Sequence, residues 1–314
     1  MGPSADRDSF IVAVRSAGER TIDACLASLR RQLDGAICHV VNEQPFERAL
    51  RRCYQIGLES GAEWMVTVDA DVLVREGALR DLLAVAAGMP DSFVQAEGLV
   101  LDKFAGTYRH AGNRVYRTRL LDVALDALGP PGVELRPESA ALARLAMRGA
   151  PSLASRVVSG VHDYEQYYRD IFRKTFVQGQ KFPEWLVEKV PQWKASGAQD
   201  PEFAIATRGF FDGYGSSELA RVDALEYVER ARRVLEESGL REKSPLQCVG
   251  DDFDRLEAAL LRPLPRRLRV DPGTRLWRIG EAYRRIGGFR MIPYLISATM
   301  SAVGERVRRF AERD

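Results

Sequence analysis

Short apolar runs alternate with amphipathic segments over residues 9–87 of this 314-residue chain. Runs of strand length are followed by stretches whose apolar residues recur at helical spacing. The predicted strands are 9–14, 36–41 and 64–68, and the predicted helices are 21–33, 46–60 and 76–87. This order predicts βαβ units, and therefore an α/β fold with a mostly parallel central sheet flanked by helices.

Ligands of such sheets bind beside the carboxyl ends of the strands. The loops 15–20, 42–45 and 69–71 each follow a predicted strand, so we expect them to line one crevice.

The pattern is less regular beyond residue 87. A strand is predicted at 92–97, a strand-like run at 114–116 and a helix at 139–147. From about residue 180 the pattern is helical, with one helix predicted over 217–237 and a Pro- and Arg-rich linker at 261–272.

The composition, 46% hydrophobic and 29% charged, is that of a globular protein. The four cysteines show no C-x-x-C pair, which favours reduced thiols and a cytoplasmic location. The sequence predicts neither a secretion signal nor a membrane span. Arginines concentrate near the C-terminus. The segment from Arg262 to Asp314 contains 13 arginines and five acidic residues, although the whole chain carries a formal charge of only +2.

Asp69 and Asp71 flank Ala70 at the end of the apolar run 64–68. Two carboxylates in apolar surroundings are costly without a positive partner. Residues two apart on a strand point to the same side, so both carboxylates are predicted to face one ion. Oxygen ligands favour Mg²⁺ or Mn²⁺. The alternative is a strand end at which these side chains accept backbone N–H bonds.

The first half of the chain resembles glycosyltransferases of the GT-A fold and is similar to glycosyltransferase family 2. The strand Phe10 to Val14, the helix residues Ala49 to Ala62 and the strand that ends in Asp69-Ala70-Asp71 carry this resemblance, which covers residues 9–120. It implies a catalytic domain at 1–240, with a nucleotide-sugar half at 9–120 and an acceptor half at 121–240. The remainder, 241–314, is predicted to be a basic, helical extension.

The resemblance implies a nucleoside-diphosphate sugar held by a divalent metal. Asp71 would ligate the metal directly, while Asp69 would reach the metal through water or bind the ribose. His162 is predicted as a further ligand, because imidazole binds Mn²⁺ well. Donor contacts are predicted for the loop residues Arg15, Glu19, Arg20, Asn42 and Glu43. For Arg15, Glu19 and Arg20 the alternative is a solvated loop.

Inverting transfer needs a general base on the acceptor side. The family usually carries an "E-D" pair there, which this chain lacks in the expected region. Glu138 is the first candidate, Asp163 the second and Glu165 the third. A favourable charge in a first helical turn explains Glu138 equally well, and retaining transfer, which needs no such base, stays open.

The apolar segment 286–304 lies between arginines. Cations and aromatic residues around it suit an anchor on an anionic membrane surface, placed at 284–309. A helix packed on the domain and a homodimer contact are the alternatives. The basic residues are not accompanied by exposed stacking aromatics, so nucleic-acid binding is not expected.

These features predict a metal-dependent glycosyltransferase that moves a sugar from a nucleoside-diphosphate sugar to a glycan, lipid-linked or small-molecule acceptor, as in polysaccharide or glycolipid biosynthesis. Two alternatives remain: a GT-A-like protein that binds nucleotide or glycan without turnover, and a phosphatase of the haloacid dehalogenase type. The second is disfavoured because its D-x-D motif belongs on the first strand.

Overall fold

A computed structural model describes residues 10–134, 136–218, 220, 221, 223, 225–246 and 255–256. The chain divides after Arg262, and every described residue belongs to the first of the two units. The linker predicted at 261–272 and the membrane-surface segment predicted at 284–309 lie outside the described residues.

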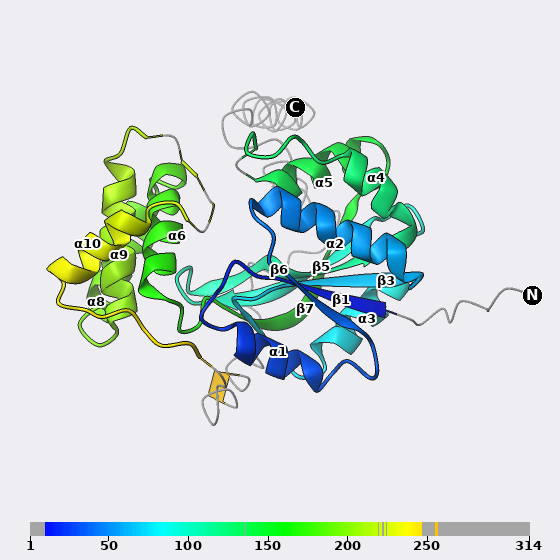
Figure 1. Cartoon of the computed structure of the whole chain (residues 1–314), viewed down its shortest axis with the longest axis horizontal. Coiled ribbons are helices and arrows are strands. Elements are labelled where there is room, and N and C mark those ends of the chain that lie inside the picture. Colours follow the sequence, from blue (N-terminus) through cyan, green and yellow to red (C-terminus); the bar gives the residue numbers. More distant parts are fainter. Residues whose placement is uncertain are drawn as a thin grey trace, which may run out of the picture. The chain divides into compact units, whose positions relative to one another are not determined.

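A seven-stranded sheet forms the centre of the described chain (Figure 1). Its strands are β1 (Phe10–Arg15), β2 (Cys38–Val41), β3 (Trp64–Asp69), β4 (Val72–Val74), β5 (Gln95–Asp102), β6 (Thr107–Arg117) and β7 (Ser152–His162). The helices that accompany it are α1 (Ile22–Arg30), α2 (Phe46–Ser60), α3 (Ala78–Ala87), α4 (Leu121–Asp126) and α5 (Pro137–Met147), with a 3-10 turn η1 at Thr118–Leu120.

The strand order is β2-β1-β3-β6-β5-β7-β4. Strands β1, β2 and β3 are parallel, as predicted, and β5 is parallel to β7. Strand β6 is antiparallel to both β3 and β5, and β4 is antiparallel to β7. The α/β class with a helix-flanked central sheet is confirmed, but the sheet is mixed rather than mostly parallel. The reason is local: a short turn joins β5 to β6, and such a turn makes an antiparallel pair.

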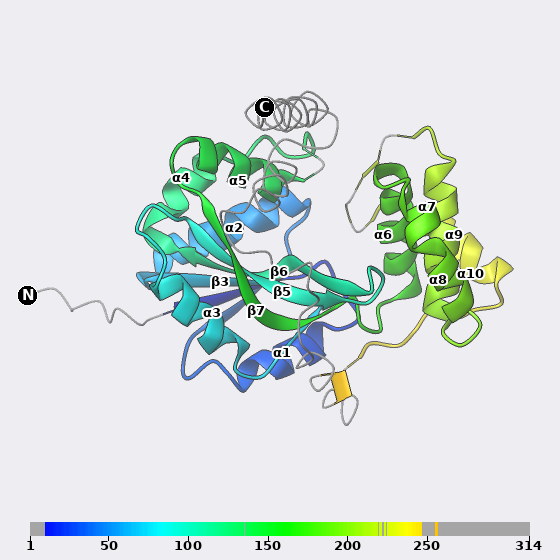
Figure 2. The ribbon, with the colours of Figure 1, turned by 180° about the vertical axis from the view of Figure 1, so that it is seen from behind.

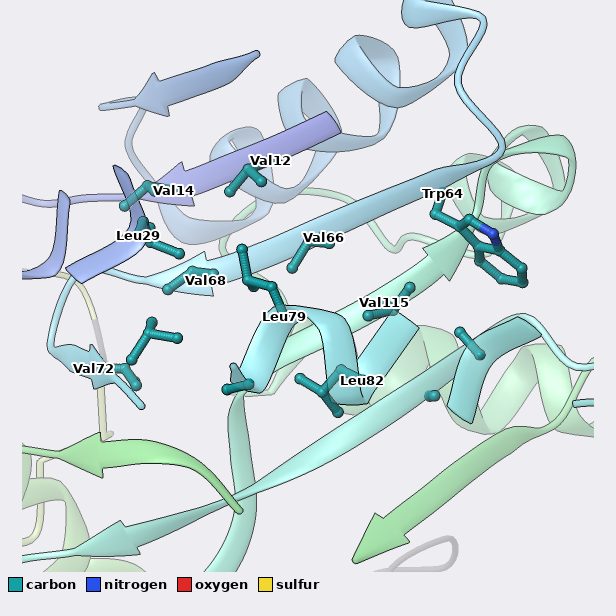
Figure 3. Close-up of a cluster of buried hydrophobic side chains, with 14 of the residues drawn as sticks. Val12, Val14, Leu29, Trp64, Val66, Val68, Val72, Leu79, Leu82 and Val115 are labelled. Carbon is teal, nitrogen blue, oxygen red and sulfur yellow. The ribbon is translucent and has the colours of Figure 1, made fainter. Parts of the chain in front are cut away.

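Helices cover both faces of the sheet, α1 and α3 on one face and α2, α4 and α5 on the other (Figures 1 and 2). A hydrophobic core lies on each face of the sheet, and side chains of β1 contribute alternately to the two. Val12 and Val14 face α1 and α3, while Ile11 and Ala13 face the opposite layer. Figure 3 shows the first of these cores, in which Leu29 of α1 and Leu79 and Leu82 of α3 meet valines of the sheet.

The chain after the sheet is helical, with α6 (Tyr168–Lys181), α7 (Trp185–Glu188), α8 (Val190–Ser196), α9 (Pro201–Tyr214) and α10 (Val228–Glu237). Buried aromatic residues, including Phe172, Trp193 and Phe210, form their shared core. The helix predicted over 217–237 is wrong in its first half: α10 begins at Val228 and is preceded by a turn at 225–227. Among the described residues no helix is both long and apolar enough to cross a membrane.

Candidate functional site

The carboxyl ends of β1, β2 and β3 lie side by side. Arg15, the last residue of β1, is in register with Val41 of β2 and Asp69 of β3. The loop after β1 is also tied to the turn after β3, because the Thr21 hydroxyl donates to the carbonyl of Ala70 at 2.8 Å. The three loops predicted to share a crevice therefore meet at one edge of the sheet.

Asp69 and Asp71 diverge instead of facing one point. Asp69 ends β3, whereas Ala70 and Asp71 form a turn before β4, and this turn breaks the alternation that a continuous strand would impose. Oδ1 of Asp69 accepts a hydrogen bond from Nε of Arg15 at 2.8 Å and lies 2.7 Å from Nη2 of the same guanidinium. Asp71 turns toward the end of β7.

Asp71, His162 and Asp163 converge there. Their candidate ligand atoms lie within 4.8 Å of one another, and all three residues are buried. The backbone explains the meeting: Val72 pairs with His162 across β4 and β7, and the N–H of Asp163 donates to the carbonyl of Asp71 at 3.1 Å. Oδ1 of Asp71 is buried and has no hydrogen-bond partner.

Carboxylates surround His162 on several sides. Its Nδ1 lies 2.9 Å from Oδ2 of Asp163 and 3.2 Å from Oδ2 of Asp102, and its Nε2 lies 3.5 Å from Oδ2 of Asp71. Burial alone would lower the pKa of His162, but Asp163 and Asp71 outweigh it and raise the pKa to about 10. Arg109 shares this cluster, since it pairs with Asp102 at 2.6 Å.

Lys174 of α6 completes the cluster. Its ammonium lies 2.5 Å from Oδ2 of Asp71 and also donates to Oδ1 of Asp163. Burial would raise the pKa of Asp71, yet the positive charges of Lys174 and His162 hold that pKa well below its usual value. Asp71 is therefore ionised across the working range of most proteins.

The donor set of Asp71, His162 and Asp163 fits a divalent cation. Two carboxylates and one imidazole are a set that Mn²⁺ accepts, and the partnerless Oδ1 of Asp71 is an oxygen that a cation would satisfy. Asp69 is not among the converging residues.

Asp69 belongs to a second buried network, centred on Glu138. Arg15 bridges Asp69 and Glu138, and Arg114 pairs with the other oxygen of Glu138 at 2.7 Å. The Tyr116 hydroxyl donates to Glu138 as well, at 2.8 Å. Burial would raise the pKa of Glu138, but Arg114 and Arg15 lower it. Both oxygens of this carboxylate are thus occupied by buried cations.

The remaining predicted donor residues occupy the loops after β1 and β2. Glu19 accepts from the Ser16 hydroxyl and the Ala17 N–H, each at 2.8 Å, and burial followed by the nearby charge of Asp71 raises its pKa. Arg20 donates to the backbone carbonyls of Ser244 and Glu165. Asn42 and Glu43 are exposed directly after β2.

Three residues of the cluster were not predicted from the sequence: Asp102, Arg109 and Lys174. Asp102 had a usable signal, because it ends the apolar run Leu99 to Leu101 at the carboxyl end of a strand. Arg109 and Lys174 had none, since only the folded chain brings β6 and α6 to the ends of β3 and β7.

A cavity of about 480 Å³ lies away from this cluster, in the helical part. Its lining includes Lys181, Tyr214 and Ser216, and it contains none of the predicted site residues.

No protein-family model matches the sequence, and no curated protein matches it at a significant level. Solved structures give weak likenesses. A mannosyltransferase from Pyrobaculum calidifontis, in complex with GDP-Man and Mn²⁺, is 14% identical with a TM-score of 0.38, covering 80% of this chain and 84% of its own.

A glycosyltransferase involved in glycosylation of the major capsid of PBCV-1 is 12% identical with a TM-score of 0.36, covering 49% of this chain and 93% of its own. A 4-diphosphocytidyl-2C-methyl-D-erythritol synthase from Anaerococcus prevotii is 11% identical with a TM-score of 0.35, covering 48% of this chain and 90% of its own. At these values the likenesses carry no argument about function, which rests on the site itself.

Proposed function

We propose that this protein is a glycosyltransferase of the GT-A type that takes its sugar from a nucleoside-diphosphate donor with the help of a divalent cation. The convergence of Asp71, His162 and Asp163 at the ends of β4 and β7 carries the proposal, together with the buried Oδ1 of Asp71 that lacks a partner. A family 2 relationship, read from residues 9–120, is part of the same proposal.

Asp71, His162 and Asp163 would hold the cation. A bound Mn²⁺ or Mg²⁺ neutralises the charge that develops on a departing nucleoside diphosphate. The protein supplies ligands that are already positioned: the Asp163 N–H bond to the Asp71 carbonyl fixes the two aspartates relative to each other. Pre-positioned charges need no reorganisation when the glycosidic bond breaks, and that makes them effective.

Arg15 and Asp69 would shape the donor side of the site. The Asp69 side chain is 28% exposed, whereas Arg15 is only 4% exposed and is held between Asp69 and Glu138. We assign Arg15 to fixing the Asp69 carboxylate, and Asp69 to the ribose of the donor. Glu19, Arg20, Asn42 and Glu43 stand in the adjoining loops and are proposed as further donor contacts.

Glu138 and Asp163 were the first two candidates for the general base. Glu138 is paired with Arg15 and Arg114, and its pKa is lowered, so we assign it to positioning Arg15. Asp163 pairs with His162 and Lys174, which suits a cation ligand better than a free base. Its role here is to hold the cation.

The test is a product-resolved assay of the full chain with Mn²⁺ and UDP-, GDP-, dTDP- and CMP-sugars. Sugar transfer or slow donor hydrolysis releases the nucleoside diphosphate, whereas transfer of the nucleotidyl group from the same donor releases the sugar 1-phosphate. We expect release of a nucleoside diphosphate from one of the UDP-, GDP- or dTDP-sugars, lost in Asp71→Asn and retained in Asp126→Asn, whose aspartate is exposed at the end of α4. Release of sugar 1-phosphate, or no turnover with any donor, would contradict the proposal.

A further inference from the structure

Lys174 stands where the proposed cation would bind. Its ammonium contacts Oδ2 of Asp71 at 2.5 Å and Oδ1 of Asp163, and these two carboxylates belong to the converging triad. We propose that the Lys174 ammonium and a divalent cation are alternative occupants of this carboxylate pair, so that metal enters by displacing Lys174. This rests on the proposed function only in taking Asp71 and Asp163 as ligands of a divalent cation.

Simultaneous occupancy is excluded by space and charge. Bonds of about 2.1 Å to oxygen place a small divalent cation against the carboxylates, in the volume that the ammonium fills. Two such ligands on opposite sides of an ion lie about 4.2 Å apart on the same bond length. The candidate ligand atoms here lie within 4.8 Å of one another, a grouping close enough for one ion, and the ammonium now contacts both aspartates.

The Lys174 ammonium does not satisfy every carboxylate oxygen of the cluster. It contacts only one oxygen of Asp71, and the other, Oδ1, is buried without a partner. Three carboxylates gather here, those of Asp71, Asp102 and Asp163, and Lys174, Arg109 and the protonated His162 are their positive partners. A divalent cation in place of Lys174 offers a further coordination position that the buried Oδ1 of Asp71 can fill, which an ammonium bound to Oδ2 does not.

The exchange requires movement of the Lys174 side chain and not of helix α6. Helix α6 is locked onto α9 by glycines: a Cβ on Gly179 would overlap the carbonyl of Phe210, and a Cβ on Gly213 would overlap that of Phe176. The Lys174 backbone therefore cannot shift along α9. Its side chain is 23% exposed, so its flexible four-carbon stem has a route toward solvent.

Because of this exchange, the site binds a cation only above a certain concentration of divalent ion. Without metal, Lys174 keeps Asp71 and Asp163 ionised and paired, so the fold does not need a cation to tolerate them. A monovalent ion brings no more charge than the ammonium and does not displace it. Only a divalent ion at sufficient concentration opens the site for a diphosphate.

The first test is a titration of metal-stripped full chain with Mn²⁺ alone, followed by electron paramagnetic resonance of the free ion. We expect Lys174→Met to bind Mn²⁺ at least tenfold more tightly than the wild type, because the competing ammonium is gone. Lys174→Arg keeps the charge and should bind no more tightly than wild type. Lys194→Met removes an exposed lysine on α8 and should leave the affinity unchanged. Equal or weaker binding by Lys174→Met would overturn the proposal.

A second measurement needs no variant, in case Lys174→Met does not fold. Acetylation of Lys174 in the native chain, followed by mass spectrometry, should become at least threefold faster when Mn²⁺ is added, because the released ammonium reaches solvent. The rate at Lys194 should not change. An unchanged or slower rate at Lys174 would overturn the exchange. Neither experiment contains nucleotide. A protein that fails to bind any donor would therefore contradict the proposed function, but the exchange between Lys174 and Mn²⁺ could still be measured.

Discussion

Nζ of Lys174 lies 2.5 Å from Oδ2 of Asp71, the carboxylate that ends the Asp-Ala-Asp motif. The second carboxylate of the motif is thus already neutralised by a side chain from a helix about a hundred residues further along the chain. Metal binding to this site has two separate costs, displacement of an ammonium and loss of a proton from His162. These costs are separable by experiment.

Proton loss from His162 predicts a pH-dependent metal affinity. The pKa of His162 is about 10, so below that pH the ring is protonated and must lose a proton to ligate a metal. The apparent Mn²⁺ affinity should rise about tenfold per pH unit between pH 6 and 8. His162→Asn should abolish the slope, whereas Lys174→Met should keep it and His39→Asn should have no effect. A flat profile in the wild type would refute a neutral His162 ligand.

The motif itself was readable from sequence because its physical signal is local. Asp69 and Asp71 follow the apolar run of β3, and the parallel register of β1, β2 and β3 follows from the alternation of strands and helices. The common direction predicted for the two carboxylates was not correct. A turn at Ala70 and Asp71 ends the strand, and the sequence carries no strong turn signal at that point.

Lys174 and Arg109 were beyond sequence reasoning for a different reason. Their place at the site depends on β6 inserting between β3 and β5 and on α6 reaching the end of β7, which are tertiary events. Neither residue interrupts a local pattern. The mixed sheet was missed for another reason, because the periodicity of β5 and β6 predicts strands without predicting their direction.

Glu138→Gln should test whether this residue positions Arg15 or acts as a base. The substitution leaves Arg15 and Arg114 buried with one charge fewer between them, so we expect a loss of about 3 kcal/mol in the free energy of unfolding. Urea unfolding measures it. Glu59→Gln is the matched control: its pair with Arg52 is exposed, and we expect a change of about 0.5 kcal/mol or less. Unchanged stability with lost turnover would instead favour a base.

Gly213→Ala should destabilise the helical part. The new Cβ would overlap the carbonyl oxygen of Phe176 and force α6 from α9. We expect a loss of about 3 kcal/mol by overpacking, measured by thermal unfolding. Gly215→Ala is the control, because its Cβ would meet only ordinary contacts at 3.5 Å. Comparable stability of the two variants would contradict the close packing of α6 on α9.

Lys181 should make stability depend on pH above neutrality. Burial, aided by Arg136, lowers the pKa of Lys181 to about 8 from 10.5. Between these values the unfolded chain binds a proton that the folded chain has lost, so this residue's contribution to stability rises with pH. Lys181→Met should therefore be more stable than wild type at pH 7, with the difference shrinking from pH 8 to 10.5. A difference in melting temperature between Lys181→Met and wild type that does not change with pH would contradict a lowered pKa of Lys181.

The central measurement is thermal-shift titration of the full chain with UDP-, GDP-, dTDP- and CMP-sugars, with Mn²⁺ and with EDTA. A ligand that binds only the folded state raises the melting temperature. If the Asp71 cluster holds a metal and a donor diphosphate, one of the UDP-, GDP- or dTDP-sugars raises the melting temperature with Mn²⁺ and fails to do so in EDTA, and Asp71→Asn loses the effect while Asp126→Asn keeps it. Stabilisation by none of the donors, or Mn²⁺-dependent stabilisation that survives in Asp71→Asn, would contradict the assignment.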